Sequence, residues 1–519
     1  MNASGPDPSL SRTTFWGLFL ALVLVRVPYF LTHHIQEDAY IAFRTAFNLA
    51  DHGVYSFNVD EHAPGATSLL FGFLEAGLRL IFGGWAIGAI LIASTIMVVG
   101  AAWLLAAALM PPGRWRACLW AAAALMPTGL LISYSGMETA LLVAAVALAV
   151  YGLGKGWRWT WIGLFLLPLI RVDAIAFGLI IIAAAIVIDW RRALVGLGAL
   201  AAGYVVLLAS NYALSGELLS RTMTAKEVSF HPDRSIGAIL ARLIKMFLTG
   251  SFLVPVETTV LMPISPLFAL LFAAGMAVAL WFVRSERFLL VRVGAMIAAI
   301  VLVPAAYALG GVLFSWYVWP SAWLAQVLMA FALIRWAATV GPPASRWVLA
   351  ALGLGLVVLD LARLVVSYNV GAHEYRYRAD VGRFIAGLAR RGDTLFLEPA
   401  GYIPFYAGIK TFDEVGLASP EILRFKERDP NDWWGPFLRE KHPTFVVQRQ
   451  DFRHYQTYDG YHFTPAEIAW FERNYELVRE FKFDPTVITD IGLARRMLGL
   501  SHDDEYLVFR YRGDRSGQS

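Results

Sequence analysis

Long apolar segments separated by short polar ones dominate the first 370 residues of the chain. A helix needs about 20 mostly apolar residues to cross the hydrocarbon core of a bilayer. Twelve stretches approach this length, at 14–32, 67–83, 86–110, 117–134, 138–154, 159–171, 174–189, 193–213, 263–283, 288–309, 318–337 and 347–367. The pattern predicts a polytopic α-helical membrane protein.

Basic residues between these stretches indicate which of them cross the membrane. They form five groups, Arg114 with Arg116, Lys155 with Arg158, Arg191 with Arg192, Arg284 with Arg287, and Arg335 with Arg346. Such loops are usually cytoplasmic. All five basic groups lie on one side of the membrane only if one of the early apolar stretches does not cross it. The weakest candidate for a transmembrane span is 67–83, which follows Pro64-Gly65 and carries Glu75 and Arg79 four residues apart.

We therefore expect about eleven transmembrane helices, with the N-terminus inside and the C-terminus outside. The segment 67–83 is then a membrane-edge helix within a first outside loop at about 33–84, because a charged amphipathic helix suits the interface. This topology puts the acids and the unusual polar motifs on the outer side. Residues 1–370 form the membrane domain in this interpretation.

The remaining residues, 371–519, have a different pattern. Charged residues are frequent, and short strand-like runs occur at 393–398, 444–448, 476–481 and 505–510. Helical patterns lie at 381–388 and 465–473. The segment predicts a small C-terminal α/β domain in the outer, extracytoplasmic compartment.

Composition agrees with a membrane protein and excludes several classes of function. Hydrophobic residues make up 58% of the chain and charged residues 16%, against about 25% charged in soluble domains. The net charge of +4 reflects basic loops and predicts no nucleic-acid partner. No phosphate-binding glycine-rich loop is present, and the cytoplasmic loops are too short for a nucleotide-binding domain. An activated substrate must therefore arrive from the membrane or from outside.

The adjacent acids Glu37 and Asp38 follow the first apolar segment at the membrane edge. An ionisable group at this depth is a candidate functional residue, because burying its charge is costly. One of the pair is expected to serve as a general base toward a hydroxyl group. The alternative is that Asp38 or Glu37 caps the following amphipathic helix, 38–50. Substrate-binding candidates on the polar face of that helix are Tyr40, Arg44 and Asn48.

Two short outside turns carry further charged residues. Glu138 precedes a span of almost only Ala, Leu and Val, and Arg171-Val172-Asp173 joins two spans. Glu138 and Asp173 are predicted to face substrate, and Arg171 to bind phosphate, since a guanidinium grips phosphate oxygens in bidentate fashion. The alternatives are a helix-start acid for Glu138 and a local ion pair that closes a helical hairpin for Arg171 and Asp173.

The longer outside segment carries Arg221, Thr222 and Lys226, which suit a phosphate group at the membrane boundary. The alternative is that the basic side chains extend to lipid headgroups. Trp316 and Tyr317, at the outer edge of another span, are either sugar-stacking residues or an interfacial aromatic belt. The histidines His33, His34, His62 and His231 form no recognisable metal signature, so the metal content is unknown and a divalent cation stays open as a cofactor.

These motifs together resemble a known family. They are Glu37-Asp38, Ala39-Tyr40-Ile41, Arg44, Asn48, Gly53, Phe57-Asn58, Gly65-Ala66-Thr67-Ser68, Gly136 to Thr139, Arg171-Val172-Asp173, Gly216 with Ser220 to Lys226, and Asp413 with Gly416-Leu417. In this order they resemble the membrane glycosyltransferases of the C-type fold, which use polyprenyl-phosphate sugars. They are most similar to the terminal arabinofuranosyltransferases of the mycobacterial cell wall. The chain differs from that pattern in having Glu37 for Asp, Val172 for Pro, and Ser220-Arg221 for Pro-Asn.

The resemblance implies a function and a location. A single sugar, with an arabinofuranose-like pentose favoured, would pass from a polyprenyl-phosphate donor to a glycan, glycolipid or glycoprotein acceptor of the cell envelope. The membrane is then the bacterial inner membrane, with the active site and the C-terminal domain facing the periplasm. Asp38, with Glu37, would activate the acceptor hydroxyl, while Lys226, Arg171 and Arg221 hold the donor phosphate. Three alternatives stay open. They are transfer of mannose, glucose or aminoarabinose to lipopolysaccharide or protein, flipping of lipid-linked sugars, and a glycan-binding or assembly subunit that has lost activity.

Overall fold

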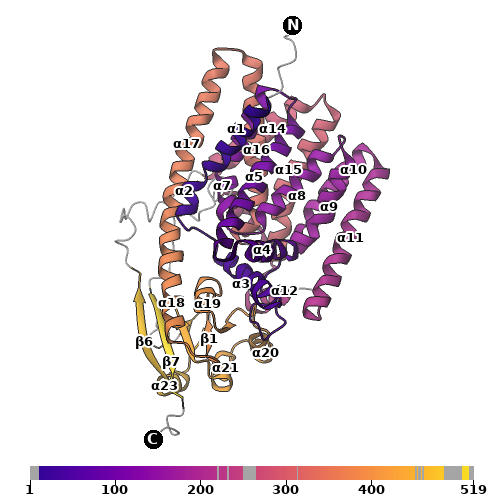
Figure 1. Ribbon diagram of the computed structural model, residues 1–519. Helices are drawn as coiled ribbons and strands as arrows, with labels where there is room; N and C mark the ends of the chain where they lie inside the picture. Colours follow the sequence, from indigo (N-terminus) through magenta and orange to yellow (C-terminus); the bar gives the residue numbers. More distant parts are fainter. Residues whose placement is uncertain are drawn as a thin grey trace.

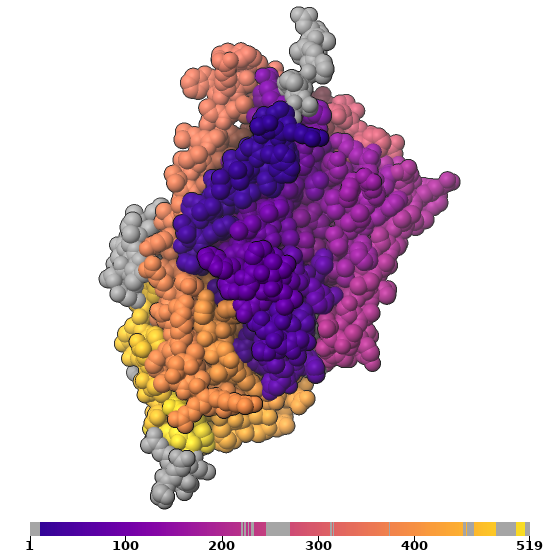
Figure 2. Space-filling view, viewed as in Figure 1, coloured from indigo at the N-terminus to yellow at the C-terminus, as the bar shows by residue number. Residues whose placement is uncertain are grey.

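A computed structural model of the chain describes residues 11–218, 221–230, 233–248, 265–311, 314–449, 453, 457–458, 461–483 and 505–513. The described residues form a long helical bundle with a small sheet domain packed against one of its ends (Figure 1). The first helix, α1 (Arg12–Leu24), begins at the opposite end of the bundle. Residues 37–82, in indigo and purple, lie between the bundle and the orange-to-yellow sheet domain (Figure 2).

The helices of the membrane domain follow the apolar segments. Their bounds are α1 Arg12–Leu24, α2 Val27–Leu31, α3 Glu37–His52, α4 Leu69–Phe82, α5 Ala86–Leu109, α6 Arg114–Leu125, α7 Pro127–Tyr134, α8 Thr139–Gly152, α9 Trp157–Ile170, α10 Ile175–Ile188, α11 Trp190–Ser215, α12 Arg221–Phe230, α13 Ile236–Leu248, α14 Ser265–Val283, α15 Arg287–Gly310, α16 Ser315–Val340 and α17 Ala344–Gly371. Two short 3₁₀ turns, Gly83–Trp85 and Val172–Ala174, precede α5 and α10.

Among the described residues, six helices are long and apolar enough to cross a membrane, or seven if the bent pair α6 and α7 is one span. Four shorter apolar helices lie at Thr139–Gly152, Trp157–Ile170, Val172–Ile188 and Leu270–Val283. Each of the eleven predicted spans contains one of these helices, and the predicted polytopic helical fold class is confirmed. Which side of a membrane each loop faces stays a prediction.

The segment predicted to lie at the membrane edge forms α4, which continues through Gly83–Trp85 into α5. It lies beside α3 at the end of the bundle that carries the sheet domain (Figure 1). Ser68 caps α4, its side chain accepting a hydrogen bond from the Phe71 amide. The helix thereby contributes to one wall of the cavity described in the next subsection. Its place at the membrane edge stays a prediction.

Small residues allow the membrane helices to approach closely. A Cβ added to Gly163 on α9 would lie 2.7 Å from the Ala145 carbonyl oxygen of α8. A Cβ on Gly203 of α11 would lie 2.3 Å from the Phe165 carbonyl oxygen of α9. Apolar side chains gain little by leaving lipid, so such backbone contact is a main source of packing energy between membrane helices.

The C-terminal domain is built on a mixed five-stranded sheet of order β2-β1-β3-β7-β6. Its strands are β1 Thr394–Leu397, β2 Lys410–Asp413, β3 Phe445–Gln448, β6 Tyr475–Lys482 and β7 Glu505–Tyr511, and β4 Thr457–Tyr458 pairs with β5 Tyr461–His462 in a separate hairpin. The strand β1 is parallel to β2 and β3, while β7 is antiparallel to β3 and β6. The four predicted strands are all present, and β2 was not predicted.

Helices link this sheet to the bundle and cover it. The last long helix, α17, continues through a π-helical stretch, Ala372–Arg378, into α18, Ala379–Leu388. The other helices of the domain are α19 Tyr402–Ala407, α20 Pro420–Arg428, α21 Trp434–Lys441 and α23 Pro465–Asn474. A buried cluster from α18, α19 and the strands, including Val381, Ile385, Leu395 and Val447, joins these helices to the sheet.

Candidate active site

The helix α3 directs its two adjacent acids to different places, because neighbouring residues on an α-helix are about 100° apart. Gln36 is the N-cap residue, with extended backbone angles and no side-chain capping bond. The alternative that Glu37 or Asp38 caps the helix is therefore wrong. Both carboxylates lie in the first helical turn, where the helix dipole favours negative charge.

Glu37 points to the sheet domain. Its Oε1 accepts hydrogen bonds from the backbone amides of Gly401 and Tyr402, at 2.7 and 3.0 Å. Its Oε2 pairs with Arg378 Nη1 at 2.8 Å, and the same guanidinium nitrogen contacts Glu374 at 2.6 Å. Burial raises the pKa of the Glu37 carboxyl, and the Arg378 cation opposes that shift. Glu37 therefore joins the first loop to the C-terminal domain and does not line the cavity described below.

The other candidates on α3 lie at the same junction. Arg44 donates to the Phe57, Pro404 and Ile409 carbonyl oxygens at 2.8, 2.6 and 2.7 Å. The ring of Tyr40 lies 3.9 Å from that of Tyr402. Asn48 donates to the Ser56 and Phe57 carbonyl oxygens, each at 2.9 Å. Arg44 and Tyr40 thus join the first loop to the sheet domain in this structure, while Asn48 fastens α3 to the rest of the first loop.

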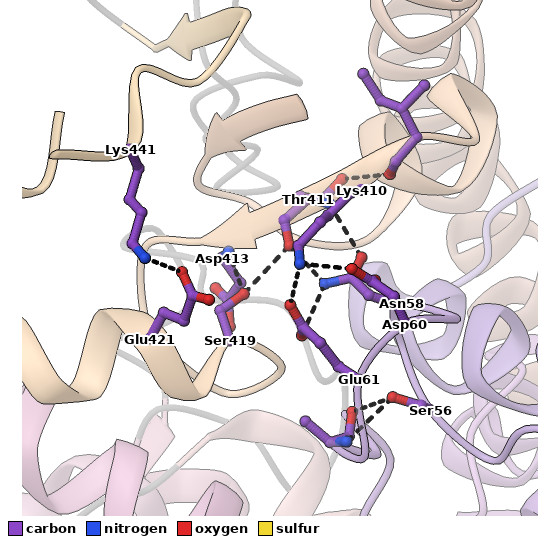
Figure 3. Close-up of polar contacts among 12 residues, drawn as sticks. Ser56, Asn58, Asp60, Glu61, Lys410, Thr411, Asp413, Ser419, Glu421 and Lys441 are labelled. Carbon is purple, nitrogen blue, oxygen red and sulfur yellow. Dashed lines mark hydrogen bonds and ion pairs between the residues drawn. The ribbon is translucent and has the colours of Figure 1, made fainter. Parts of the chain in front are cut away.

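The first loop also docks along the edge strand β2 (Figure 3). The Asn58 side chain donates to the Thr411 carbonyl oxygen at 2.9 Å and accepts from the Thr411 amide at 3.0 Å, as a neighbouring strand would. Lys410 Nζ pairs with Asp60 and Glu61 at 2.7 and 2.9 Å. The Phe57-Asn58 motif therefore positions the loop on the sheet.

Replacing Glu37 with Leu should destabilise the protein without changing the cavity. The change leaves the Gly401 and Tyr402 amides without their acceptor and removes one of the two carboxylates that contact Arg378. Unsatisfied buried donors cost about 1–3 kcal/mol each. We expect the midpoint of thermal unfolding of detergent-purified protein to fall by several degrees. An exposed control, Asp380→Leu at the i,i+3 pair with Arg383, should leave it unchanged. Equal midpoints for parent and Glu37→Leu would contradict this role.

Asp38 faces a cavity of about 370 Å³ at the end of the bundle. Residues that line it include Asp38, Gly65 to Ser68, Glu75, Glu138, Arg171, Asp173, Asn211, Thr222, Lys226, Arg234, Tyr307, Trp316, Tyr317 and Leu417. Its volume falls within the range of ligand pockets, about 300–1,000 Å³. Seven of the predicted site residues other than Asp38 therefore share one space with it: Glu138, Arg171, Asp173, Thr222, Lys226, Trp316 and Tyr317.

Asp38 is half-buried and makes no hydrogen bond to another residue within the described part of the chain. Burial raises the pKa of its carboxyl to about 6, and the cation of Lys226 opposes this shift. A carboxylate of this kind is a suitable general base, because its oxygens are open to a ligand and its affinity for a proton is increased.

Arg171 organises the carboxylates on the opposite wall. Its Nε and Nη2 form a bidentate pair with Asp173 at 2.9 and 2.7 Å, and its Nη1 contacts Glu138 at 2.9 Å. The guanidinium also lies 4.6 Å from the centre of the Tyr317 ring. These contacts match the ion-pair alternative for the hairpin. They use three of the five N–H donors of an arginine, so two are left to meet a ligand. Phosphate binding by Arg171 stays a prediction.

Lys226 brings a positive charge to the cavity from α12. Its Nζ donates to the Tyr317 hydroxyl at 2.6 Å, and Tyr317 stacks on Tyr307 with ring centroids 4.9 Å apart. Thr222, one helical turn before Lys226, is buried and lines the same cavity. The side chain of Arg221 lies outside the described residues, so its predicted phosphate contact stays a prediction.

The sheet domain completes the cavity through the loop after β2. Asp413 accepts hydrogen bonds from the Val415 and Ala418 amides, each at 3.0 Å, and its own amide donates to Ser419 Oγ at 2.8 Å. These bonds fix the loop that places Leu417 against the cavity. The loop also holds α12, since Ser229 Oγ donates to the Val415 carbonyl oxygen at 2.7 Å.

Sequence reasoning missed several cavity residues. Tyr307, Arg234 and Asn211 were not among the predicted site residues. Glu75 was noted only for its spacing from Arg79 on the predicted membrane-edge helix, and in the structure Arg79 pairs with Asp51 at 2.8 Å. In the part of the chain that the structure describes, no three His, Cys, Asp or Glu side chains are grouped as metal ligands would be.

Comparisons with known proteins bear on the fold. A family model described as a domain of unknown function, DUF8728, matches residues 367–509. No curated protein matches the chain. A solved structure of ArnT from Cupriavidus metallidurans bound to undecaprenyl phosphate is similar with a TM-score of 0.57 and 13% identity, covering 98% of this chain and 100% of that one. The same protein in the apo state has a TM-score of 0.55 and 14% identity, covering 96% and 98%.

These likenesses extend over nearly the whole chain, including both the bundle and the sheet domain. At 13–14% sequence identity, these similarities establish a shared fold and nothing beyond it. The narrower resemblance to arabinofuranosyltransferases stays a prediction. The chain thus has the ArnT-like C-type glycosyltransferase fold, a polytopic helical membrane domain followed by a small sheet domain.

Proposed function

We propose that this protein is a membrane glycosyltransferase that moves one sugar from a polyprenyl-phosphate donor to a hydroxyl group of a cell-envelope acceptor. The observation that carries the proposal is the cavity at the sheet-domain end of the bundle. It combines a half-buried carboxylate without a hydrogen-bond partner among the described residues, Asp38, with the cations Arg171 and Lys226. The fold likeness to ArnT, a protein solved with undecaprenyl phosphate, adds support for a lipid-phosphate donor.

Each of the cavity residues has a separate role in the proposed reaction. Asp38 takes the proton from the acceptor hydroxyl as its oxygen forms a bond to the anomeric carbon of the sugar. The bond from that carbon to the phosphate oxygen breaks, and its electron pair stays with the polyprenyl phosphate. Lys226 and Arg171, with Arg221 and Thr222 nearby on α12, stabilise the phosphate, whose developing charge needs positive groups rather than an added proton. Trp316 and Tyr317 offer faces on which the sugar ring stacks.

The substrates and the location follow from the same proposal. The sequence motifs favour an arabinofuranose-like pentose, and the acceptor is a glycan, glycolipid or glycoprotein. The protein acts in the bacterial inner membrane with its cavity and sheet domain toward the periplasm. Carboxylates of Glu138 and Asp173 in the cavity suit any sugar rich in hydroxyl or amino groups, so mannose, glucose and aminoarabinose are the alternative donors.

A panel of polyprenyl-phosphate sugars, each labelled in the sugar, tests the proposal. Purified protein in detergent or nanodiscs should consume one donor and release polyprenyl phosphate. Each reaction should be run with Mg²⁺, with Mn²⁺ and with a chelator, since a divalent cation is untested as a cofactor. A protein that consumes no donor, but moves labelled lipid across the bilayer of a proteoliposome, would be a flippase and would contradict the proposal.

Activity should depend on pH through Asp38. A general base must be ionised, so protonation removes activity, and the pKa of about 6 places this loss well above the ordinary aspartate range. We expect kcat/KM to fall about tenfold per pH unit below pH 6. Because Lys226 favours the ionised form, Lys226→Met should move this limb to higher pH. A kcat/KM that stays constant down to pH 5 would exclude Asp38 as the base.

A further inference from the structure

Glu75 is a fully buried acid whose chemistry the proposed mechanism does not use. It lies on α4 with a relative exposure of 0%, and it lines the cavity that contains Asp38 and Lys226. Neither of its oxygens accepts a hydrogen bond from any residue that the structure describes. Buried polar groups are nearly always hydrogen-bonded, so a carboxyl group left open toward a cavity calls for a ligand.

The surrounding cations are engaged elsewhere. Arg79, four residues along the same helix, forms a bidentate contact with Asp51, with distances of 3.1 and 2.8 Å. Arg171 holds Asp173 and Glu138. Lys226 donates to the Tyr317 hydroxyl at 2.6 Å. These contacts leave both oxygens of Glu75 without a partner among the described residues, at the wall of the cavity.

The charge around Glu75 restricts what it binds. Burial, and to a smaller extent the charge of Glu138, raises the pKa of the Glu75 carboxyl. Surroundings that disfavour negative charge in this way are unfavourable for a phosphate group, which belongs with Lys226 and Arg171. A carboxyl group with two open oxygens instead accepts hydrogen bonds from adjacent O–H or N–H groups. In a polyprenyl-phosphate sugar, such donors are found on the sugar ring.

We propose that Glu75 binds the sugar of the lipid-linked donor by accepting hydrogen bonds from neighbouring hydroxyl or amino groups on its ring. The proposal rests on the glycosyltransferase function above and adds the sugar subsite of that cavity. Glu75 then selects the sugar and orients it, while Asp38 performs the proton transfer. A site built to hydrogen-bond polar groups of a substrate discriminates strongly against analogues that lack them, because its own polar groups would stay unpaired.

The test compares two ligands and three proteins. The ligands are undecaprenyl phosphate and the polyprenyl-phosphate sugar that the parent consumes. The proteins are Glu75→Gln, Glu75→Leu and a matched control, Glu421→Gln, whose carboxylate pairs with Lys441 in the sheet domain. Dissociation constants are measured for both ligands, together with the thermal midpoint of the ligand-free protein.

Both Glu75 variants should bind undecaprenyl phosphate within about twofold of the parent. Glu75→Leu should bind the sugar-bearing donor about tenfold or more weakly, since it loses hydrogen bonds to a buried acceptor. Glu75→Gln, which keeps one acceptor oxygen, should fall between Glu75→Leu and the parent. The midpoints of both variants should equal or exceed that of the parent, because each removes an uncompensated buried carboxyl group. The control should match the parent throughout.

Three outcomes would overturn the inference. Unchanged affinity for the sugar-bearing donor would remove Glu75 from the sugar subsite, even though the glycosyltransferase function stood. An equal loss of affinity for both ligands would show that Glu75 supports phosphate binding or folding, and not sugar binding. A midpoint lowered by several degrees would assign it a structural role. A parent that consumes no donor in the panel would instead remove the proposed function itself, and this inference with it.

Discussion

Asp38→Asn should lower glycosyl transfer about 100-fold or more while the protein stays folded. General-base catalysis contributes about 10²–10⁴-fold, and an amide keeps the shape of the carboxylate without its affinity for a proton. Asp38 is half-buried and has no hydrogen-bond partner among the described residues, so the change breaks no hydrogen bond within that part of the chain. Single-turnover rates with saturating donor, measured beside the thermal midpoint, separate lost chemistry from lost folding.

The control for this change lies on the same helix. Asp51→Asn is also an acid-to-amide change on α3, but Asp51 is 39% exposed and pairs with Arg79 outside the cavity. Its transfer rate should stay within about twofold of the parent, because exposed ion pairs contribute about 0–1 kcal/mol. If Asp38→Asn transfers as fast as Asp51→Asn, Asp38 is not the base and the mechanism fails.

Lys226→Met should weaken the binding of undecaprenyl phosphate about 10–150-fold. Hydrogen bonds to charged groups are worth about 1.5–3 kcal/mol, and the Lys226 ammonium lies in a partly buried position against Tyr317. Methionine keeps the length and the apolar stem of the lysine but removes its charge. Binding is best followed by calorimetry in detergent at two salt concentrations, since a charge pair with phosphate weakens as salt screens it.

Two further variants show whether the charge itself matters. Lys226→Arg should recover most of the affinity, because a guanidinium also binds phosphate. Lys441→Met, which removes a lysine paired with Glu421 in the sheet domain, should bind as the parent does. Equal affinity of Lys226→Met and the parent would place the lipid phosphate away from α12.

Much of the fold could be predicted because membrane helices have a strong signal. Every predicted span contains an apolar helix, and the strands 393–398, 444–448, 476–481 and 505–510 coincide with β1, β3, β6 and β7. The missed strand, β2, has only four residues, Lys410–Asp413, and its two ends are charged. Its place at the sheet edge is fixed by pairing with β1 and by Asn58, which are tertiary contacts.

Part of the candidate site could also be predicted, because polar residues stand out at the ends of apolar segments. Unusual polar residues at the ends of apolar segments identified Asp38, Glu138, Arg171, Asp173 and Lys226, which share the cavity. Sequence patterns could not separate Glu37 from Asp38, because the difference depends on Gly401 approaching α3. A Cβ on Gly401 would lie 2.2 Å from the Glu37 carbonyl oxygen, so only glycine allows this contact.

Glu75 was not among the predicted site residues. Its spacing of four residues from Arg79 makes a helical ion pair available to it. The structure instead pairs Arg79 with Asp51 on α3, because α3 and α4 pack together and bring Asp51 within reach. Local spacing indicates which partners are available, and the packing of distant helices decides which are used.

The central claim is that this cavity holds the lipid phosphate beside Lys226 with Asp38 facing the sugar. A cryo-electron microscopy structure of the purified protein in nanodiscs with undecaprenyl phosphate tests it most directly. We predict phosphate density in the cavity, within hydrogen-bonding distance of Lys226 or Arg171, with Asp38 beside it and open to the remaining space. Phosphate density bound elsewhere on the protein, with the cavity free of lipid, would contradict the account.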